Sequence, residues 1–171
     1  HSLGGYVVLA MAELRPEAPA GFGLFHSTAT ADSEEKKLNR TRVMDFVSKN
    51  GVDPFVDTFV PGLFFKKDPQ IMQRADAMAR KTKMATLLAY TEAMRDRPDR
   101  QAVLRQAGRP VLIVAGEQDA LIPLELLENQ SQLLHRGRFE VLKQTGHMGM
   151  FEARDEVISV LSRFATAGFA M

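Results

Sequence analysis

Cysteine is absent from this 171-residue sequence, which excludes a disulfide framework and a metal site built on thiolates. The absence suits a reducing compartment, so we expect a cytoplasmic protein. Long hydrophobic runs are also absent, because the apolar segment 111–115 is bounded by Pro110 and Gly116. A helix that crosses a bilayer needs about 20 apolar residues. The sequence therefore predicts a protein that does not span a membrane.

An excess of charge of either sign is missing as well. The 22 lysines and arginines balance 21 aspartates and glutamates, and no basic run is long enough to form a stripe. Nucleic acids and anionic membranes need clustered positive charge, so we expect neither as a partner. A hydrophobic content of 45% is enough for one domain with a buried core, and the expected ligand is a small molecule.

Signals for a metal or a phosphate-binding loop are not found. The four histidines, at positions 1, 26, 135 and 147, lack the paired spacing with carboxylates that a zinc-binding helix shows. Gly4 and Gly5 lack the lysine and the spacing of a P-loop. We therefore expect neither a metal nor a cofactor.

Strand and helix signals alternate at both ends of the chain, whereas its middle is helical throughout. Apolar spacing predicts a helix over residues 3–14 and a strand over 20–25. From Asp32 to about Arg97 one helix follows another, and the expected N-caps are Ser33, Asp53 and Asp68. The later elements are expected to be a strand over 110–115, a helix over 124–134, a strand over 139–142 and a helix from residue 152.

This order predicts an α/β core formed by residues 1–31 and 98–171, with an all-helical insertion over 32–97. The charged run 34–42 is interpreted as a solvated helix face without a function. Two helices should each bury one apolar side, made of Leu38, Val43, Phe46 and Val47 in the first inserted helix and of Val157, Ile158, Leu161 and Phe164 in the last helix.

Ser2 is the candidate nucleophile. A nucleophilic serine needs a sharp turn from strand to helix, flanked by small residues, so that its hydroxyl stands clear of the backbone. Gly4 and Gly5 follow Ser2 and an apolar helix begins at once, which matches the downstream half of G-x-S-x-G. Taken alone, the pattern also fits an ordinary capped helix.

Two partners for Ser2 follow later in the chain. Asp119 comes after the apolar strand at 111–115, and His147 lies in a loop between two glycines. Taken singly, Asp119 also fits a turn aspartate and His147 a surface histidine. The order Ser, Asp, His, each after a strand, is the order of an α/β-hydrolase triad. The chain order therefore favours a catalytic triad over a helix cap, a turn aspartate and a surface histidine.

The segments HSLGG, PVLIVAGEQDALIP and TGHMGMFEARDEV resemble the nucleophile, acid and base segments of the α/β-hydrolase superfamily. The resemblance covers essentially the whole chain. It implies a mostly parallel sheet flanked by helices, with the helical insertion as a cap over the site. It also implies that five strands and a loop with one oxyanion donor precede His1, so we expect the C-terminal part of the fold. Such a part should pair with the missing N-terminal portion or self-associate.

The function implied is that of a serine hydrolase acting on a small ester, thioester or related carbonyl compound through an acyl-enzyme. His147 would be the general base, Asp119 would orient it, and the backbone N–H of Leu3 would be one oxyanion donor. A serine nucleophile disfavours the dehalogenases and epoxide hydrolases of the superfamily. The alternatives are a hydrolase-fold binding protein without catalysis, and a fragment that is inactive without its N-terminal half.

Five residues are candidates for the wall of the substrate pocket. They are His1, His26, Ser27, Met94 and Met148. A structural hydrogen bond is the other interpretation of His26, and core packing is the other interpretation of the methionines.

Overall fold

Three parallel strands form the centre of the molecule. The computed structural model describes residues 1–169. Its strands lie in the order β1-β2-β3, and Val111 in the middle pairs with Phe22 on one side and Gly137 on the other. The strands are β1 (Phe22–Phe25), β2 (Val111–Gly116) and β3 (Gly137–Leu142). Every residue of β2 is buried, as expected for a central parallel strand covered on both faces.

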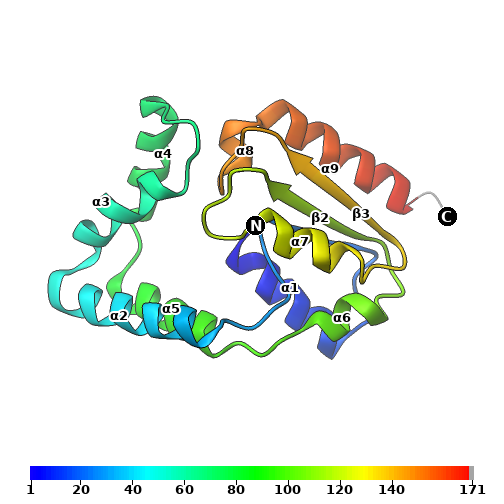
Figure 1. Ribbon diagram of the computed structural model, residues 1–171, viewed down its shortest axis with the longest axis horizontal. Helices are drawn as coiled ribbons and strands as arrows, with labels where there is room; N and C mark the ends of the chain where they lie inside the picture. The colour runs from blue at the N-terminus through cyan, green and yellow to red at the C-terminus, as the bar shows by residue number, and fades with distance from the viewer. Residues whose placement is uncertain (170–171) are drawn as a thin grey trace.

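Helices cover both faces of this sheet (Figure 1). Along β2, Val111 and Ile113 belong to the hydrophobic cluster on one face, whereas Leu112 and Val114 belong to the cluster on the other. The first cluster packs against α1 (Leu3–Leu14), α6 (Gln101–Gln106) and α7 (Leu124–Ser131), and the second packs against α9 (Arg154–Phe169). The predicted α/β class and parallel sheet are confirmed, although α6 was not predicted.

A helical lobe is inserted between β1 and β2 and stands beside the sheet (Figure 1). It has a core of its own, to which Val56, Val60 and Phe64 contribute. The sheet and the helices that cover it form the sheet body, and Met148 and Phe151 of this body pack against the core of the lobe. The helices of the lobe are α2 (Glu34–Asn50), α3 (Val52–Gly62), α4 (Pro69–Ala79) and α5 (Met84–Asp96). These contacts hold the lobe against the loop that follows β3.

Local signals explain where the helices of the lobe begin. The Ser33 side chain accepts a hydrogen bond from the Lys36 N–H, and the Asp68 side chain accepts from the N–H groups of Gln70 and Ile71, as N-caps do. Asp53 is not a cap, so that prediction is wrong. Gly51 turns the chain with φ 86°, and α3 begins at the next residue, which leaves Asp53 inside its first turn.

Two predicted apolar helix faces are wrong in part. In α2 only Val47 is buried, and Leu38 and Phe46 are exposed. Among the α9 side chains that the structure describes, Val157 and Val160 are buried, whereas Ile158 and Leu161 are exposed. Each helix packs along one narrow stripe, so neighbouring apolar residues lie outside the contact.

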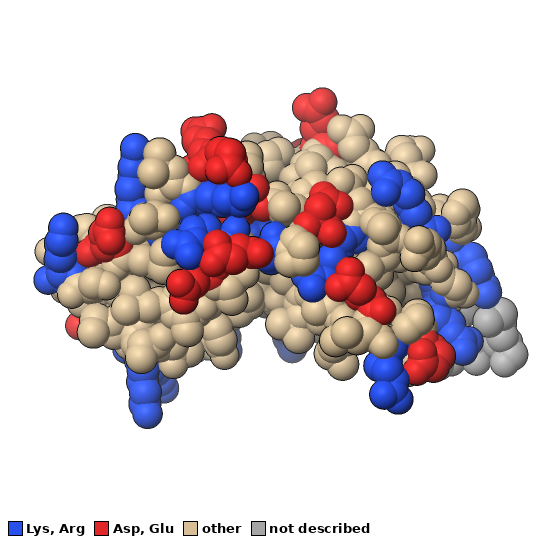
Figure 2. Space-filling view, turned by 90° about the horizontal axis from the view of Figure 1, so that it is seen from below, with Lys and Arg blue, Asp and Glu red and all other residues tan. Residues whose placement is uncertain are grey.

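The outer surface of the described chain carries apolar side chains and mixed charge. On α1, Val7, Met11 and Leu14 are exposed, and β1 is an edge strand among the described residues. Figure 2 shows lysines, arginines, aspartates and glutamates interspersed on one face. None of the described helices is long and apolar enough to cross a membrane.

Candidate active site

Ser2 lies at a strained turn directly before α1. Its backbone has φ 48° and ψ −117°, a region that residues with a Cβ rarely adopt. Two contacts hold this conformation: the Ser2 N–H donates to the carbonyl oxygen of Phe25 over 2.9 Å, and the Ser27 hydroxyl donates to the Ser2 carbonyl over 2.8 Å. The end of β1 therefore fixes the position of Ser2. A strained residue held in this way is typical of a functional site.

The two glycines after Ser2 have different roles. A Cβ on Gly5 would lie 2.5 Å from the Cβ of Ser27 and 3.3 Å from a methyl of Leu24. A Cβ on Gly4 would meet no described atom within 4 Å. Only Gly5 is therefore required by the close approach of α1 to β1.

His147 connects Ser2 to Asp119. The Ser2 Oγ lies 3.0 Å from His147 Nε2, and His147 Nδ1 lies 2.8 Å from Asp119 Oδ2. Asp119 follows β2 and His147 follows β3, so both side chains come from the carboxyl ends of parallel strands, where α/β proteins place ligand sites. The structure thus brings together the three residues that the sequence selected.

Both oxygens of the Asp119 carboxylate are occupied. Oδ1 accepts hydrogen bonds from the backbone N–H groups of Leu121 and Ile122, at 2.9 and 3.0 Å. Oδ2 accepts from His147 and from His26, at 2.8 and 3.1 Å. Burial opposes ionisation, but these hydrogen bonds hold the pKa of Asp119 well below its ordinary value. Asp119 is therefore both a turn aspartate and the anion beside the imidazole.

His26 lies behind Asp119 and not on a pocket wall, which corrects the sequence-based assignment. Its side chain is fully buried, its backbone has φ 47°, and its Nε2 has no partner among the described residues. Burial lowers the pKa of His26, against the opposing effect of Asp119. A Cβ on Gly116 or Gly149 would come within 3 Å of this imidazole. Two glycines therefore leave the space that His26 fills.

Glu152 holds the loop that carries His147. Its Oε2 accepts from the Gly146 N–H over 2.9 Å, and its Oε1 accepts from the N–H groups of Phe65 and Lys66. The backbone N–H of His147 also donates to the carbonyl of Leu63. These bonds connect the His147 loop to the helical lobe. Sequence reasoning missed Glu152, because no local pattern shows where a carboxylate reaches in space.

A cavity of about 430 Å³ opens over Ser2, between the sheet body and the helical lobe. Ser2, Leu3 and His147 lie at its base, and Met94 is among the residues that line it. Its wall also includes Tyr6, Asp32, Lys36, Asn39, Arg40, Val43, Phe55, Phe59, Leu87, Thr91, Arg97, Leu121 and Ile122.

Three other residues expected on this wall lie elsewhere. His1 is beside the His147 loop, where its Nε2–H donates to the His147 carbonyl over 2.8 Å. Ser27 is fully buried beneath Ser2, and Met148 packs against the core of the helical lobe. None of these three side chains lines the cavity.

One group of described residues has the composition of a metal site. It consists of His26, Asp119 and His147, whose ligand atoms lie within 4.8 Å of one another. Both imidazoles donate a proton to the same Asp119 oxygen, so a cation there would have to displace two hydrogen bonds. The group fits a hydrogen-bonded acid and base better than a metal centre.

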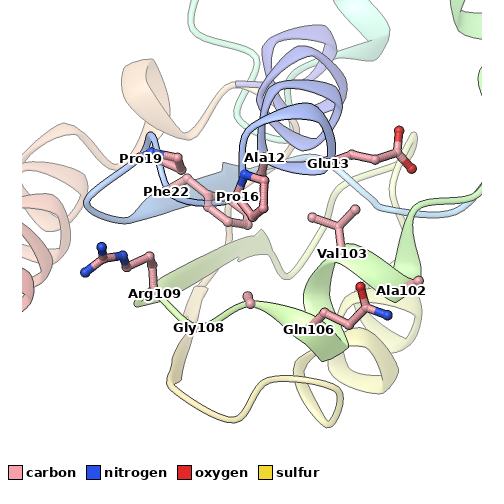
Figure 3. A pocket seen from close by; sticks show the side chains of 11 residues that line it. Ala12, Glu13, Pro16, Pro19, Phe22, Ala102, Val103, Gln106, Gly108 and Arg109 are labelled. Carbon is pink, nitrogen blue, oxygen red and sulfur yellow. The ribbon is translucent and has the colours of Figure 1, made fainter.

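A second, smaller cavity lies far from this site. It measures about 140 Å³ and lies where α1 ends and β1 and β2 begin, with Pro16, Phe22 and Arg109 among its lining residues (Figure 3). None of the residues around Ser2 borders it. The cavity that contains Ser2 and His147 is therefore the one at the carboxyl ends of the strands.

Comparison with known proteins identifies the family. The family model described as "Alpha/beta hydrolase family" matches residues 1–160. The chain belongs to the alpha/beta hydrolase family. Among curated proteins, this hydrolase-family chain is 28% identical to a dihydrolipoyllysine-residue acetyltransferase component of the acetoin cleaving system from Pseudomonas putida. That alignment covers 92% of the chain and 42% of the relative.

Solved structures of alpha/beta hydrolases share its fold. A thermophilic esterase from Thermogutta terrifontis, solved with malate bound, is 27% identical with a TM-score of 0.91, over 98% of this chain and 63% of that one. An enol-lactonase from Burkholderia xenovorans LB400 is 20% identical with a TM-score of 0.81, over 96% of this chain and 63% of that one. The chain thus spans less than two thirds of the length of these hydrolases.

Proposed function

We propose that this protein is a serine hydrolase that cleaves a small ester or thioester through an acyl-enzyme on Ser2. One observation carries the proposal. A continuous hydrogen-bonded series runs from the Ser2 hydroxyl through His147 to Asp119, at the base of a cavity. Separations of 3.0 and 2.8 Å are within the range that proton transfer to a general base requires.

In the first half of the reaction, His147 Nε2 takes the proton of the Ser2 hydroxyl while Oγ attacks the substrate carbonyl carbon. The tetrahedral intermediate then collapses, and the same proton passes from Nε2 to the departing alcohol or thiol. Asp119 stays ionised and stabilises the imidazolium that forms in between. In the second half, His147 takes a proton from water, the hydroxide oxygen attacks the acyl carbon, and the proton returns to Ser2.

The backbone N–H of Leu3 is the proposed oxyanion donor in this chain. Leu3 is the first residue of α1, so its N–H has no acceptor within the helix, and it makes no hydrogen bond among the described residues. It also borders the cavity next to Ser2. Loss of one such donor typically costs about 2.7–4 kcal/mol of transition-state stabilisation.

The choice of an ester or thioester rests on likeness and on size. The Thermogutta terrifontis protein of 27% identity is an esterase, whereas the lactonase, at 20%, supports the fold alone. A cavity of about 430 Å³ suits a small molecule.

Hydrolysis of p-nitrophenyl acetate and butyrate by the protein at its full natural length tests this proposal. We expect turnover that is lost in Ser2→Ala and retained in Ser48→Ala, a control on the exposed side of α2. A folded protein without turnover on any acyl ester would instead favour a hydrolase-fold binding protein. Turnover that survives Ser2→Ala would place the nucleophile elsewhere.

A further inference from the structure

The side of α2 that faces the cavity over Ser2 is mainly polar. Lys36, Asn39, Arg40 and Val43 line the cavity, and their spacing of three, four and seven residues places them on one stripe of the helix. The stripe of a helix that faces the rest of a protein is ordinarily apolar. The charged run 34–42 is therefore more than a solvated face, because part of it forms a wall of the site.

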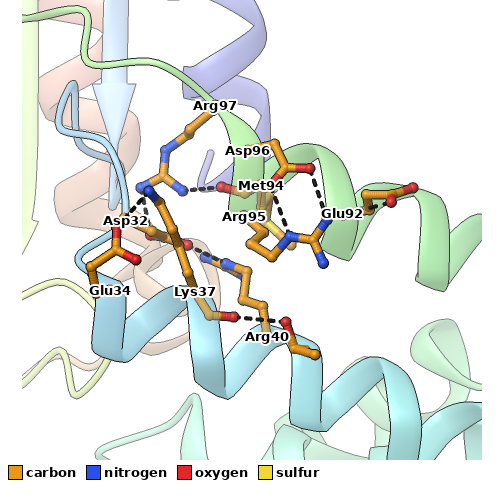
Figure 4. A network of polar contacts seen from close by, with 10 residues as sticks. Asp32, Glu34, Lys37, Arg40, Glu92, Met94, Arg95, Asp96 and Arg97 are labelled. Atoms are coloured by element: carbon orange, nitrogen blue, oxygen red, sulfur yellow. Dashed lines mark hydrogen bonds and ion pairs between the residues drawn. The ribbon is translucent and has the colours of Figure 1, made fainter.

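Asp32 forms ion pairs that fix the position of this wall. Its carboxylate accepts from Arg40 Nε over 2.5 Å and pairs with the Nη2 of Arg97 over 2.8 Å (Figure 4). Arg97 also donates to the carbonyl of Met94, and its guanidinium lies 4.1 Å from the ring centre of Tyr6. Burial opposes the ionisation of Asp32, but the two arginines hold its pKa below the ordinary value. Arg97 and Asp32 thus fix the position of the Arg40 side chain.

Two cations on this wall lack a full complement of partners. The bond to Asp32 uses only Nε of Arg40, so its two terminal amino groups make no hydrogen bond among the described residues. Lys36 forms no ion pair among the described residues, whereas its neighbour Lys37 pairs with Glu34. Like charges four residues apart destabilise a helix by roughly 0.2–0.5 kcal/mol. Helix stability therefore does not account for the pair Lys36 and Arg40.

The charge of the cavity wall is positive overall. Three cations, Lys36, Arg40 and Arg97, face the single anion Asp32, which leaves a net charge of +2 over the described lining residues. The rest of the described wall is largely apolar and includes Phe55, Phe59, Leu87, Leu121 and Ile122. A cavity with one cationic wall and one apolar wall complements a ligand with an anionic group at one end.

We propose that Lys36 and the terminal amino groups of Arg40 form a subsite for a carboxylate on the substrate, and that the protein hydrolyses esters or thioesters that carry such a group. This inference rests on the proposed function, because it assumes hydrolysis at Ser2, but it concerns Lys36 and Arg40 and not the triad. A planar carboxylate matches the fork of a guanidinium, and an ammonium group adds a third donor. The carboxylate would bind on α2 while the reacting carbonyl lies at Ser2.

Matched ester pairs test the subsite on the full-length protein. In one pair the carboxylate is on the acyl side, with monoethyl glutarate compared with ethyl hexanoate. In the other it is on the alcohol side, with 4-acetoxybutanoate compared with pentyl acetate. We expect kcat/KM to favour the anionic member of at least one pair by roughly tenfold or more. Equal kcat/KM values, or a preference for the neutral member, in both pairs would overturn the proposal.

Substitutions on α2 test whether Lys36 and Arg40 cause the preference for the anionic ester. Lys36→Met and Arg40→Met should each lower the ratio of anionic to neutral kcat/KM by roughly tenfold, mainly through KM. Lys37→Met, one residue away and paired with Glu34, should leave the ratio unchanged. Lys36→Met changes an exposed side chain and keeps the test valid if Arg40→Met does not fold. A ratio that neither substitution changes would contradict the assignment of the subsite.

Binding of glutarate to Ser2→Ala, measured by calorimetry, separates the subsite from the reaction. If Lys36→Met weakens glutarate binding while the wild-type protein hydrolyses no ester, the result would support the subsite and overturn the proposed function. Ester turnover without a preference for carboxylates, and without glutarate binding, would support the proposed function and overturn the subsite.

Discussion

His26 donates its Nδ1–H to Asp119 Oδ2 over 3.1 Å, and this is the oxygen that also accepts the Nδ1–H of His147. With two backbone N–H groups on the other oxygen, the carboxylate accepts four hydrogen bonds. Its orientation is therefore set before any substrate binds. Preorganised anions of this kind stabilise developing charge without reorganisation during the reaction.

The burial of His26 predicts a pH dependence of stability. Its pKa is lowered in the folded protein, so below the unfolded value of about 6.5 the unfolded state binds more protons and the folded state loses stability. The loss is at most about 1.4 kcal/mol per pH unit. His26→Asn keeps a donor toward Asp119 and tolerates a positive φ, but it does not titrate.

Urea denaturation of both proteins between about pH 7.5 and pH 5.5 checks this dependence. The wild-type protein should lose more stability over this range than His26→Asn, and the other histidines cancel in the comparison. Equal losses in the two proteins would contradict a lowered pKa of His26 in the folded protein.

Asp119→Asn should leave the fold in place and nearly abolish activity. An amide offers N–H groups toward imidazole N–H groups, so His147 loses the acceptor that fixes its tautomer. We expect kcat to fall by roughly 10⁴. Ester kinetics and circular dichroism measure the two effects, and a variant with more than a tenth of wild-type activity would show that Asp119 does not orient the base.

The neighbouring glycines provide a matched pair. Gly5→Ala places a methyl against Ser27, whose position is fixed by β1, so we expect a loss of about 1–3 kcal/mol in unfolding free energy and lower activity. Gly4→Ala adds a methyl in open space on a helix, where alanine is favoured over glycine. Thermal denaturation of both variants should therefore show opposite changes, and similar losses would contradict the packing described for α1.

Glu152→Gln should reduce kcat by roughly 10- to 100-fold with little change in KM, because the loop of His147 would lose its charged acceptor and shift. Glu156→Gln, on the exposed first turn of α9, is the control and should keep wild-type kinetics. If Glu152→Gln changed only KM, the carboxylate would act on substrate binding and not on the position of the base.

Much of the fold could be predicted because local signals and tertiary contacts agree. The caps at Ser33 and Asp68 mark helix starts through their own hydrogen bonds, and the apolar segment of β2 is buried on both faces. The predictions of buried helix faces failed in part, because tertiary contacts decide which residues of a helix are buried. Leu38 and Ile158 are exposed because the partner elements reach only one stripe of each helix, and spacing alone does not show which stripe.

For the candidate site, chain order selected Ser2, Asp119 and His147, which the structure brings within hydrogen-bond distance. The supporting residues could not be found in this way. His26 was assigned to the pocket, but the turn after β1 directs it toward Asp119, and Glu152 acts on backbone groups far away in sequence. Such roles depend on positions in space that no short motif encodes.

The most direct test of the account is covalent labelling of the full-length protein with a fluorophosphonate, followed by mass spectrometry of the modified peptide. The reagent reacts with a serine only when an adjacent base activates it. We predict one label per chain on Ser2, absent from Ser2→Ala and strongly slowed in Asp119→Asn. A folded protein that stays unlabelled, or that is labelled at another serine, would contradict the central claim that Ser2, His147 and Asp119 act as a catalytic triad.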